Sequence, residues 1–246
     1  MLEYPTMHLY GKRPVIERLK SDPKTIRSLY LQQGVALPDV VQTAKAAGKV
    51  FVSVPKSDFT KLAGEVHAQG VLAEVEEFQY IPLEDLLKKP EPRPTLLLLD
   101  RVTDPQNLGA ILRTCACLGG IALVLPKHDS ALVNETVLRV ACGGENYVPV
   151  SLVTNLVHAC ELAKEAGYWI AGAQTNDGEP IHKAAWPSPL GVVLGSEGGG
   201  IRPGLKKHLE LTLTLPMPGA ALSFNVATAA ALIAYEITRR RLEGSR

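Results

Sequence analysis

Residues 96–113 read LLLLDRVTDPQNLGAILR, which is a run of four leucines, a polar turn, and apolar residues at helical spacing. The leucine run predicts a buried strand. Asp104 followed by Pro105 predicts a helix start, because a carboxylate can cap the first turn and proline needs no amide hydrogen there. The apolar face of this helix comprises Leu108, Ile111, Leu112, Cys115 and Leu118. Open α/β sheets place ligand groups at such strand-to-helix junctions, so Asn107 and Arg113, which lie off this face, are either solvated side chains or part of a site.

The alternation of strands and helices continues after the proline-rich stretch at 88–94. Short apolar runs predict strands at 96–99, 121–125, 169–173, 191–194 and 211–215, with helical stretches between them. This order favours an α/β fold with a mainly parallel sheet covered on both faces.

A smaller α/β domain is predicted before the prolines. Apolar runs indicate strands at 26–31, 50–54 and 71–75, with a helix at 38–47. Because prolines stop helices and favour extended connections, we expect a first domain over 1–78, a linker over 79–94 and a second domain over 95–246.

Composition excludes several classes of protein. The 246 residues include 26 basic and 25 acidic side chains, a balance that argues against indiscriminate binding of nucleic acid. No apolar run approaches the roughly 20 residues that span a bilayer, and the N-terminus lacks a signal-peptide pattern, so we expect a cytoplasmic protein with no membrane attachment. The four cysteines lack zinc-site or disulfide-framework spacing, which predicts free thiols and no metal.

A second polar turn follows the strand predicted at 191–194. Residues 191–204 read GVVLGSEGGGIRPG, a strand followed by a glycine-rich loop that holds one carboxylate, Glu197. Glycines let the backbone approach a ligand closely. The G-x-G-x-x-G spacing of dinucleotide-binding loops is absent and Pro203 interrupts the following helix, which disfavours a nicotinamide-dependent oxidoreductase.

A third stretch, LTLPMPGAALSFNVAT at 213–228, leads from a strand through a proline-rich loop into an alanine-rich helix. Ser223 or Asn225 can cap that helix, which is a purely structural role. The elaborate loop directly after a strand favours a functional role instead.

These three stretches, in this order, resemble the signature motifs of the SpoU-type RNA ribose 2'-O-methyltransferases of the SPOUT class. The first motif covers residues 107–113, the second 195–198, and the third 215–217 with 223–226. The early stretches LYGKRPVIERL at 9–19 and VHAQG at 66–70 are similar to that family's substrate-binding domain. The stretches at 102–107 and 140–143 are similar to the branch that methylates a guanosine in the peptidyl-transferase region of 23S rRNA.

The resemblance implies a fold and a set of partners. The expected catalytic domain is a parallel sheet whose C-terminal segment forms a deep trefoil knot, and the expected assembly is a homodimer. S-adenosylmethionine is the implied cofactor, held by Gly195, Leu215 and Phe224. Two residues depart from the family pattern: Phe224 stands where leucine is usual and Ala227 where a small hydroxyl residue is frequent.

The resemblance also implies catalytic roles. Arg113 is the implied base for the ribose hydroxyl, with Asn107, Glu197, Ser223 and Asn225 completing the reaction centre. Because arginine in water loses its proton only above about pH 12.5, Arg113 acts either as a base or as a bidentate clamp on a phosphate.

RNA recognition is expected to rest mainly on the N-terminal domain, through Lys12, Arg13 and Arg18. Two other functions stay open at this point. One is methylation of a guanosine in tRNA, and the other is a non-catalytic RNA-binding relative that has kept the fold.

Overall fold

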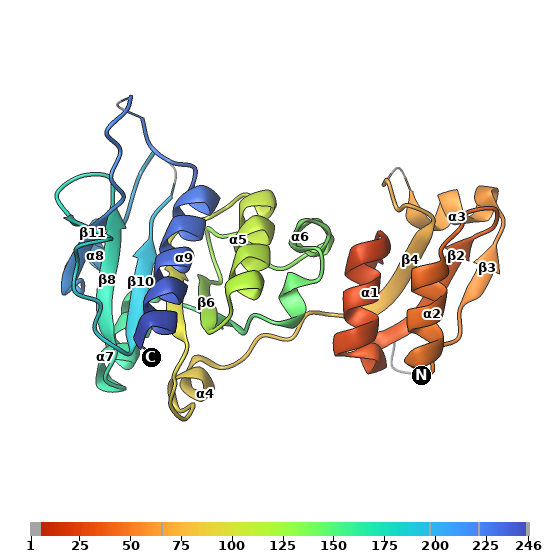
Figure 1. The fold of residues 1–246 in the computed structure, drawn as a ribbon, viewed down its shortest axis with the longest axis horizontal. Helices are drawn as coiled ribbons and strands as arrows, with labels where there is room; N and C mark the ends of the chain where they lie inside the picture. The colour runs from red at the N-terminus through yellow and green to blue at the C-terminus, as the bar shows by residue number, and fades with distance from the viewer. Residues whose placement is uncertain (1–5, 65, 197, 221, 245–246) are drawn as a thin grey trace.

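The computed structural model describes residues 6–64, 66–196, 198–220 and 222–244, which form two sheets, one in each half of the chain (Figure 1). The first sheet has the order β1-β4-β2-β3. Its strands are β1 (Thr6–Tyr10), β2 (Ile26–Gln32), β3 (Val52–Val54) and β4 (Val71–Glu76), and its helices are α1 (Lys12–Ser21), α2 (Pro38–Ala46) and α3 (Lys56–Ala63). Strand β4 is antiparallel to both neighbours, whereas β2 and β3 are parallel.

The second sheet has seven strands in the order β7-β6-β5-β10-β8-β11-β9, and each adjacent pair is parallel. The strands are β5 (Thr95–Leu99), β6 (Ile121–Pro126), β7 (Val150–Val153), β8 (Trp169–Gln174), β9 (Glu179–Pro180), β10 (Leu190–Leu194) and β11 (Leu211–Thr214). The predicted α/β class with a mainly parallel sheet is therefore confirmed. The trefoil knot stays a prediction.

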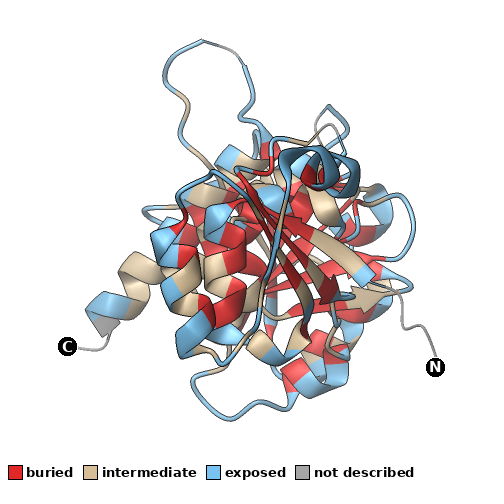
Figure 2. Ribbon diagram, turned by 90° about the vertical axis from the view of Figure 1, so that its right-hand side faces the viewer, coloured by how far each residue is buried: buried red, intermediate tan, exposed pale blue. Residues whose placement is uncertain are grey.

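Helices cover both faces of this sheet because alternate residues of each strand point to opposite sides. Leu97 and Leu99 pack in one cluster with α5 (Pro105–Leu118), α6 (Glu135–Ala141) and α9 (Val226–Gly244). Leu96 and Leu98 pack in the other with α4 (Leu83–Leu87), α7 (Leu156–Glu165) and α8 (Pro203–Lys206). The buried strands of this sheet thus lie between two helical layers. Figure 2, viewed from the side of the first domain, shows buried strands in red beside helices whose outward residues are exposed.

Three strands were not predicted from the sequence. They are β1, β7 and β9, which have few residues or lack a clear apolar run. The strand predicted at 50–54 begins only at Val52, and Val50, outside it, is 87% exposed. Helix α4 lies inside the predicted linker, and its three leucines are buried against the second sheet.

The two halves are in contact. Strand β1 and helix α1 pack against α6 and against the short 3-10 helix η2 (Gly144–Asn146). One hydrophobic cluster includes Leu9 and Val15 from the first half and Leu108 and Val137 from the second. None of the helices in the described ranges is both long enough and apolar enough to cross a membrane.

Candidate functional site

Helix α5 begins as its sequence predicts. Asp104 Oδ1 accepts a hydrogen bond from the backbone N–H of Gln106 at 2.9 Å, and Pro105 occupies the first turn. Four residues of the predicted apolar face, Leu108, Ile111, Leu112 and Cys115, are buried. Arg113 lies off this face and is exposed.

The glycine-rich loop after β10 folds back on itself. A Cβ added to Gly195 would lie 2.2 Å from the carbonyl carbon of Gly200, so no larger residue fits without moving the loop. Predicted Glu197 lies outside the described residues.

Two residues that follow β5 hold this loop, and the sequence interpretation gave neither of them a role. Asp100 is fully buried, and its carboxylate accepts from the backbone N–H of Arg202 at 2.9 Å and pairs with the Arg202 guanidinium at 2.7 Å. Arg101 Nη2 donates to the carbonyl of Gly200 at 3.2 Å. The sequence did contain a signal for the role of Asp100. A carboxylate directly after a run of leucines is expected to be buried, and a buried charge requires a partner.

A cavity of about 420 Å³ lies between this loop and the loop before α9. The predicted residues Gly195, Leu215, Ser223 and Phe224 all line it. Further polar lining residues, which sequence reasoning missed, are Gln174, Thr175, Asn176, Asp177, Ser196 and Lys206. The cavity thus combines a backbone cradle with apolar walls and polar groups, which is typical of small-molecule sites.

Asn225 stands between Phe224 and Val226, which both line the cavity, and it connects this loop to α5. Its Oδ1 accepts from the backbone N–H of Ala227 at 2.8 Å, so Asn225 caps helix α9. Its Nδ2 donates to Asn107 Oδ1 at 3.0 Å. One side chain, that of Asn225, therefore both caps α9 and contacts the first motif.

Arg113 lies farther along α5 and is not among the described residues that line the cavity. It is six residues after Asn107, about 9 Å along the helix axis. Its Nη1 donates to Cys142 Sγ at 3.6 Å. The structure thus brings the second and third motifs together around a cavity and joins the first motif to them through Asn107.

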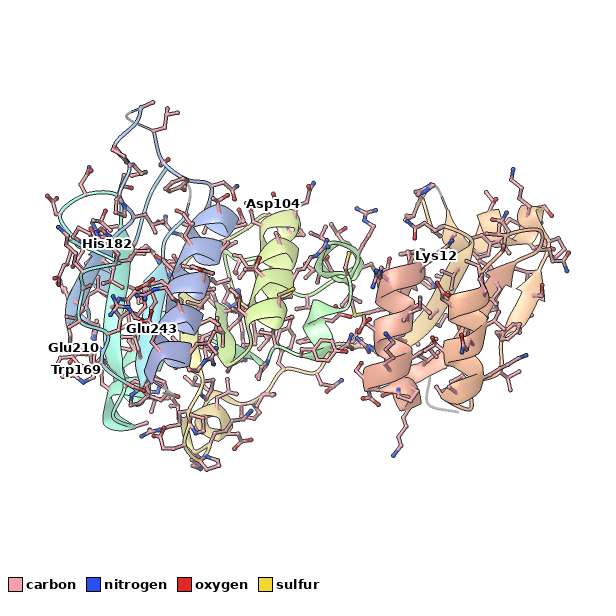
Figure 3. The ribbon with its side chains drawn as sticks, in the orientation of Figure 1. Lys12, Asp104, Trp169, His182, Glu210 and Glu243 are labelled. Atoms are coloured by element: carbon pink, nitrogen blue, oxygen red, sulfur yellow. The ribbon has the colours of Figure 1, made fainter. Side chains whose placement is uncertain are left out.

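The three basic residues predicted to bind RNA have different environments. Lys12 and Arg13 are exposed at the start of α1, and Figure 3 shows Lys12 at the upper end of α1 and Asp104 at the upper end of α5. Arg18 is buried at 7% exposure, where it pairs with Glu145 and donates to Thr25 Oγ1. The Arg18 side chain therefore points into the contact between the two halves, unlike Lys12 and Arg13, and its predicted role in RNA binding stays a prediction.

A second hollow, of about 530 Å³, lies in the first half of the chain. Lys12, Gln32, Thr60, His67 and Gln69 supply its polar lining. The stretch VHAQG at 66–70 therefore borders it, next to Lys12. Within the described part of the chain, no three His, Cys, Asp or Glu side chains are grouped as metal ligands.

Family models match most of the chain. Residues 94–235 match the SpoU rRNA Methylase family, and residues 8–81 match the family described as RNA 2'-O ribose methyltransferase substrate binding.

Individual relatives agree with this assignment. The chain is 37% identical over 239 residues to a 23S rRNA (guanosine-2'-O-)-methyltransferase RlmB of Pseudomonas aeruginosa, covering 95% of this chain and 96% of that protein. It is 36% identical over 239 residues to an uncharacterized tRNA/rRNA methyltransferase of Synechocystis. That match covers 95% of this chain but spans only 62% of the relative's length.

Solved structures share the fold over nearly the whole chain. A TrmH-family protein from Porphyromonas gingivalis matches with a TM-score of 0.75 and 29% identity, covering 96% of this chain and 90% of that one. The SpoU methyltransferase AviRb from Streptomyces viridochromogenes, in complex with AdoMet, matches with a TM-score of 0.79 and 22% identity, covering 97% and 91%. The chain therefore belongs to the SpoU rRNA methylase family, and it is an RNA ribose methyltransferase in which a substrate-binding domain precedes the methylase domain.

Proposed function

We propose that this enzyme transfers a methyl group from S-adenosylmethionine to the 2'-hydroxyl of a guanosine in the peptidyl-transferase region of 23S rRNA. The observation that carries the proposal is the hydrogen bond from Asn225 to Asn107, which joins the cavity to the helix that bears Arg113. The identity to an RlmB enzyme over the full chain supports the choice of 23S rRNA.

The residues of the cavity fit S-adenosylmethionine. Gly195 has no room for a side chain, so the backbone itself forms one wall, and Leu215 and Phe224 supply apolar surface for an adenine ring. Asp177 and Lys206 offer charges of both signs to the zwitterionic amino-acid end. When bound, this cofactor supplies a methyl group on a positively charged sulfonium.

Arg113 acts in the proposal as a clamp on RNA. The exposed guanidinium can hold a phosphate with two parallel hydrogen bonds. Such a clamp fixes the ribose hydroxyl in line with the methyl group, and alignment of this kind lowers the barrier by up to about 7–11 kcal/mol. The hydroxyl releases its proton to solvent water as the new O–C bond forms. Asn107, Glu197, Ser223 and Asn225 complete the proposed reaction centre.

The N-terminal domain, over residues 1–78, supplies RNA recognition, and residues 79–94 connect it to the catalytic domain over 95–246. Exposed Lys12 lines the hollow that His67 and Gln69 also border, and exposed Arg13 follows Lys12 in the chain. We assign contacts with RNA phosphates to these two cations. The enzyme works as a homodimer in this proposal. Helix α9 exposes Leu232 at 39% and Tyr235 at 60%, which gives a partner subunit apolar surface to cover.

Transfer of labelled methyl groups tests the proposal. Purified enzyme with methyl-labelled S-adenosylmethionine is incubated with 23S rRNA fragments from the peptidyl-transferase region and, separately, with tRNA, and modified riboses are mapped by alkaline-resistance sequencing. We expect one 2'-O-methylguanosine in the rRNA and none in tRNA. Labelling of tRNA alone would favour the tRNA alternative; the name of the Synechocystis relative includes both tRNA and rRNA. RNA binding without any transfer would identify a non-catalytic relative.

A further inference from the structure

The segment of residues 142–147, which connects α6 to β7, forms the support beneath Arg113; we call it the Arg113 platform. Cys142 Sγ accepts from Arg113 Nη1, and Cys142 itself has a left-handed backbone with φ 53°. A Cβ added to Gly144 would lie 2.9 Å from the Cα of Arg113 and 3.1 Å from its backbone nitrogen. The platform therefore contacts both the backbone and the guanidinium of Arg113.

The opposite side of the platform contacts the substrate-binding domain through α1. A Cβ added to Gly143 would lie 2.4 Å from the Cβ of Glu17, so α1 lies directly against this glycine. Tyr147 donates from its hydroxyl to Glu17 Oε2 at 2.9 Å. The platform is thus held between the substrate-binding domain on one side and Arg113 on the other.

Glu145 is the centre of this contact. Its side chain is fully buried, and its Oε1 lies 3.4 Å from Nη2 of Arg18, whose side chain is 8% exposed. Asn146 Nδ2 also donates to Glu145 Oε1, at 3.2 Å, and to the carbonyl of Gly143, at 2.9 Å. One carboxyl group therefore joins α1 to the turn that packs on Arg113.

The Arg18–Glu145 pair is poorly built for stability. Glu145 Oε2 and Arg18 Nε are both buried, and neither has a hydrogen-bond partner among the described residues. Burial raises the pKa of the Glu145 carboxyl, against the opposing effects of backbone hydrogen bonds and of Arg18. A buried ion pair can often be replaced by apolar residues without loss of stability. This favours a role for the pair in fixing one arrangement of the two halves over a role in stability.

We infer that Glu145 is a positioning residue, which acts through Arg18 and the Arg113 platform so that docking of the substrate-binding domain sets the place of the Arg113 guanidinium. The inference rests on the proposed role of Arg113 in the function above. It means that the domain that captures RNA also sets the geometry of the reaction.

Steady-state kinetics of the full-length enzyme test this inference. In Glu145→Gln we expect kcat to fall by about 10- to 100-fold, because a displacement near 1 Å in a reacting group costs that much, while the KM for RNA and the Kd for S-adenosylmethionine stay within about threefold. The matched control is Glu135→Gln. Glu135 also bridges the two halves, accepting from the backbone of His8 at 2.8 Å, but it does not belong to the platform, so kcat stays within about twofold.

Thiol labelling reports on the platform without any catalysis. Cys142 on the platform and exposed Cys117 on α5 serve as probe and internal control, since burial raises the pKa of Cys115 and of Cys160 to about 12 and keeps both unreactive near pH 8. We expect Glu145→Gln to increase the alkylation rate of Cys142 by about fivefold or more, read by mass spectrometry, with Cys117 unchanged.

The outcomes separate the inference from the proposed function. A raised KM for RNA with kcat unchanged, or an unchanged alkylation rate at Cys142, would show that Glu145 only docks the domain and would overturn the inference. Full activity of Arg113→Ala would instead overturn the proposed role of Arg113. If Glu145→Gln does not fold, Arg18→Met with Glu145→Gln removes both charges from the buried pair, and the same two results are expected and decisive.

Discussion

Asn225 Nδ2 donates to Asn107 Oδ1 at 3.0 Å, although the two residues are 118 positions apart in the chain. Asn107 lies in the first turn of α5, and Asn225 is the residue before α9. These two helices pack against each other and against the same face of the sheet. The hydrogen bond therefore fixes the starts of both helices relative to each other, next to the cavity.

Replacement of Asn225 separates its two roles. Asn225→Ala loses the cap and the link, and we expect a loss of about 1–2 kcal/mol in the free energy of unfolding and a fall of tenfold or more in methyl transfer. Asn225→Asp keeps an oxygen for the N–H of Ala227 but not the amide N–H, so stability is near wild type while activity stays low. Urea unfolding and a methyl-transfer assay measure the two effects. Full activity in either variant would show that Asn225 only caps α9 and that its link to Asn107 is not needed for methyl transfer.

Gly195 tests the backbone cradle of the cavity. Gly195→Ala places a Cβ 2.2 Å from the backbone of Gly200, so the loop must open and we expect the Kd for S-adenosylmethionine to rise by tenfold or more. Gly219→Ala is the matched control, because an added Cβ there meets nothing within 4 Å. Isothermal titration calorimetry gives both constants. Equal affinity in the two variants would exclude the proposed contact of cofactor and loop.

The local parts of this site follow from the sequence, whereas its long-range supports do not. Asp104 and Pro105 specify the start of α5 through contacts within one turn, and the prediction is confirmed. Arg18 appeared in the sequence as one of a basic cluster, and nothing local signals that its partner is Glu145, 127 residues away. The contacts of Cys142 and Gly144 with Arg113 are likewise not signalled locally, because they depend on the packing of α6 and η2 against α5.

Charge reversal tests the expected RNA surface. Lys12→Glu with Arg13→Glu replaces two exposed cations, so we expect weaker RNA binding and a shallower dependence of log Kd on log salt, by up to about 1.4–1.8 units for two lost phosphate contacts. Lys88→Glu with Lys89→Glu makes the same change in net charge at exposed residues of the connection between the domains. Filter binding at several salt concentrations compares the two. An identical effect of both double variants would mean that net charge, not this surface, determines affinity.

Ionisation of Glu236 on α9 makes the stability of the protein depend on pH. Its nearly buried carboxylate accepts from Arg239 Nε and Nη2, each at 2.8 Å, and from Arg240 Nε at 2.5 Å. The hydrogen bonds from Arg239, and then those from Arg240, hold the pKa of the Glu236 carboxyl below its usual 4.5 despite its burial. Arg240 also donates to the carbonyl of Ile181 at 3.0 Å, so this cluster ties the last helix to the loop after β9.

Because the folded protein binds this proton less readily than the unfolded chain, the stabilisation by Glu236 is present above about pH 4.5 and is lost as pH falls through the lowered pKa. We expect Glu236→Gln to lose about 1–3 kcal/mol at pH 7, with the difference from wild type narrowing below pH 4. Glu243→Gln, whose exposed carboxylate pairs with the same Arg239, changes stability by at most about 1 kcal/mol. Urea unfolding of all three proteins between pH 3 and pH 7 gives the curves. A difference between Glu236→Gln and wild type that is constant over this range would assign the effect to packing, because only an ionised carboxylate makes it depend on pH.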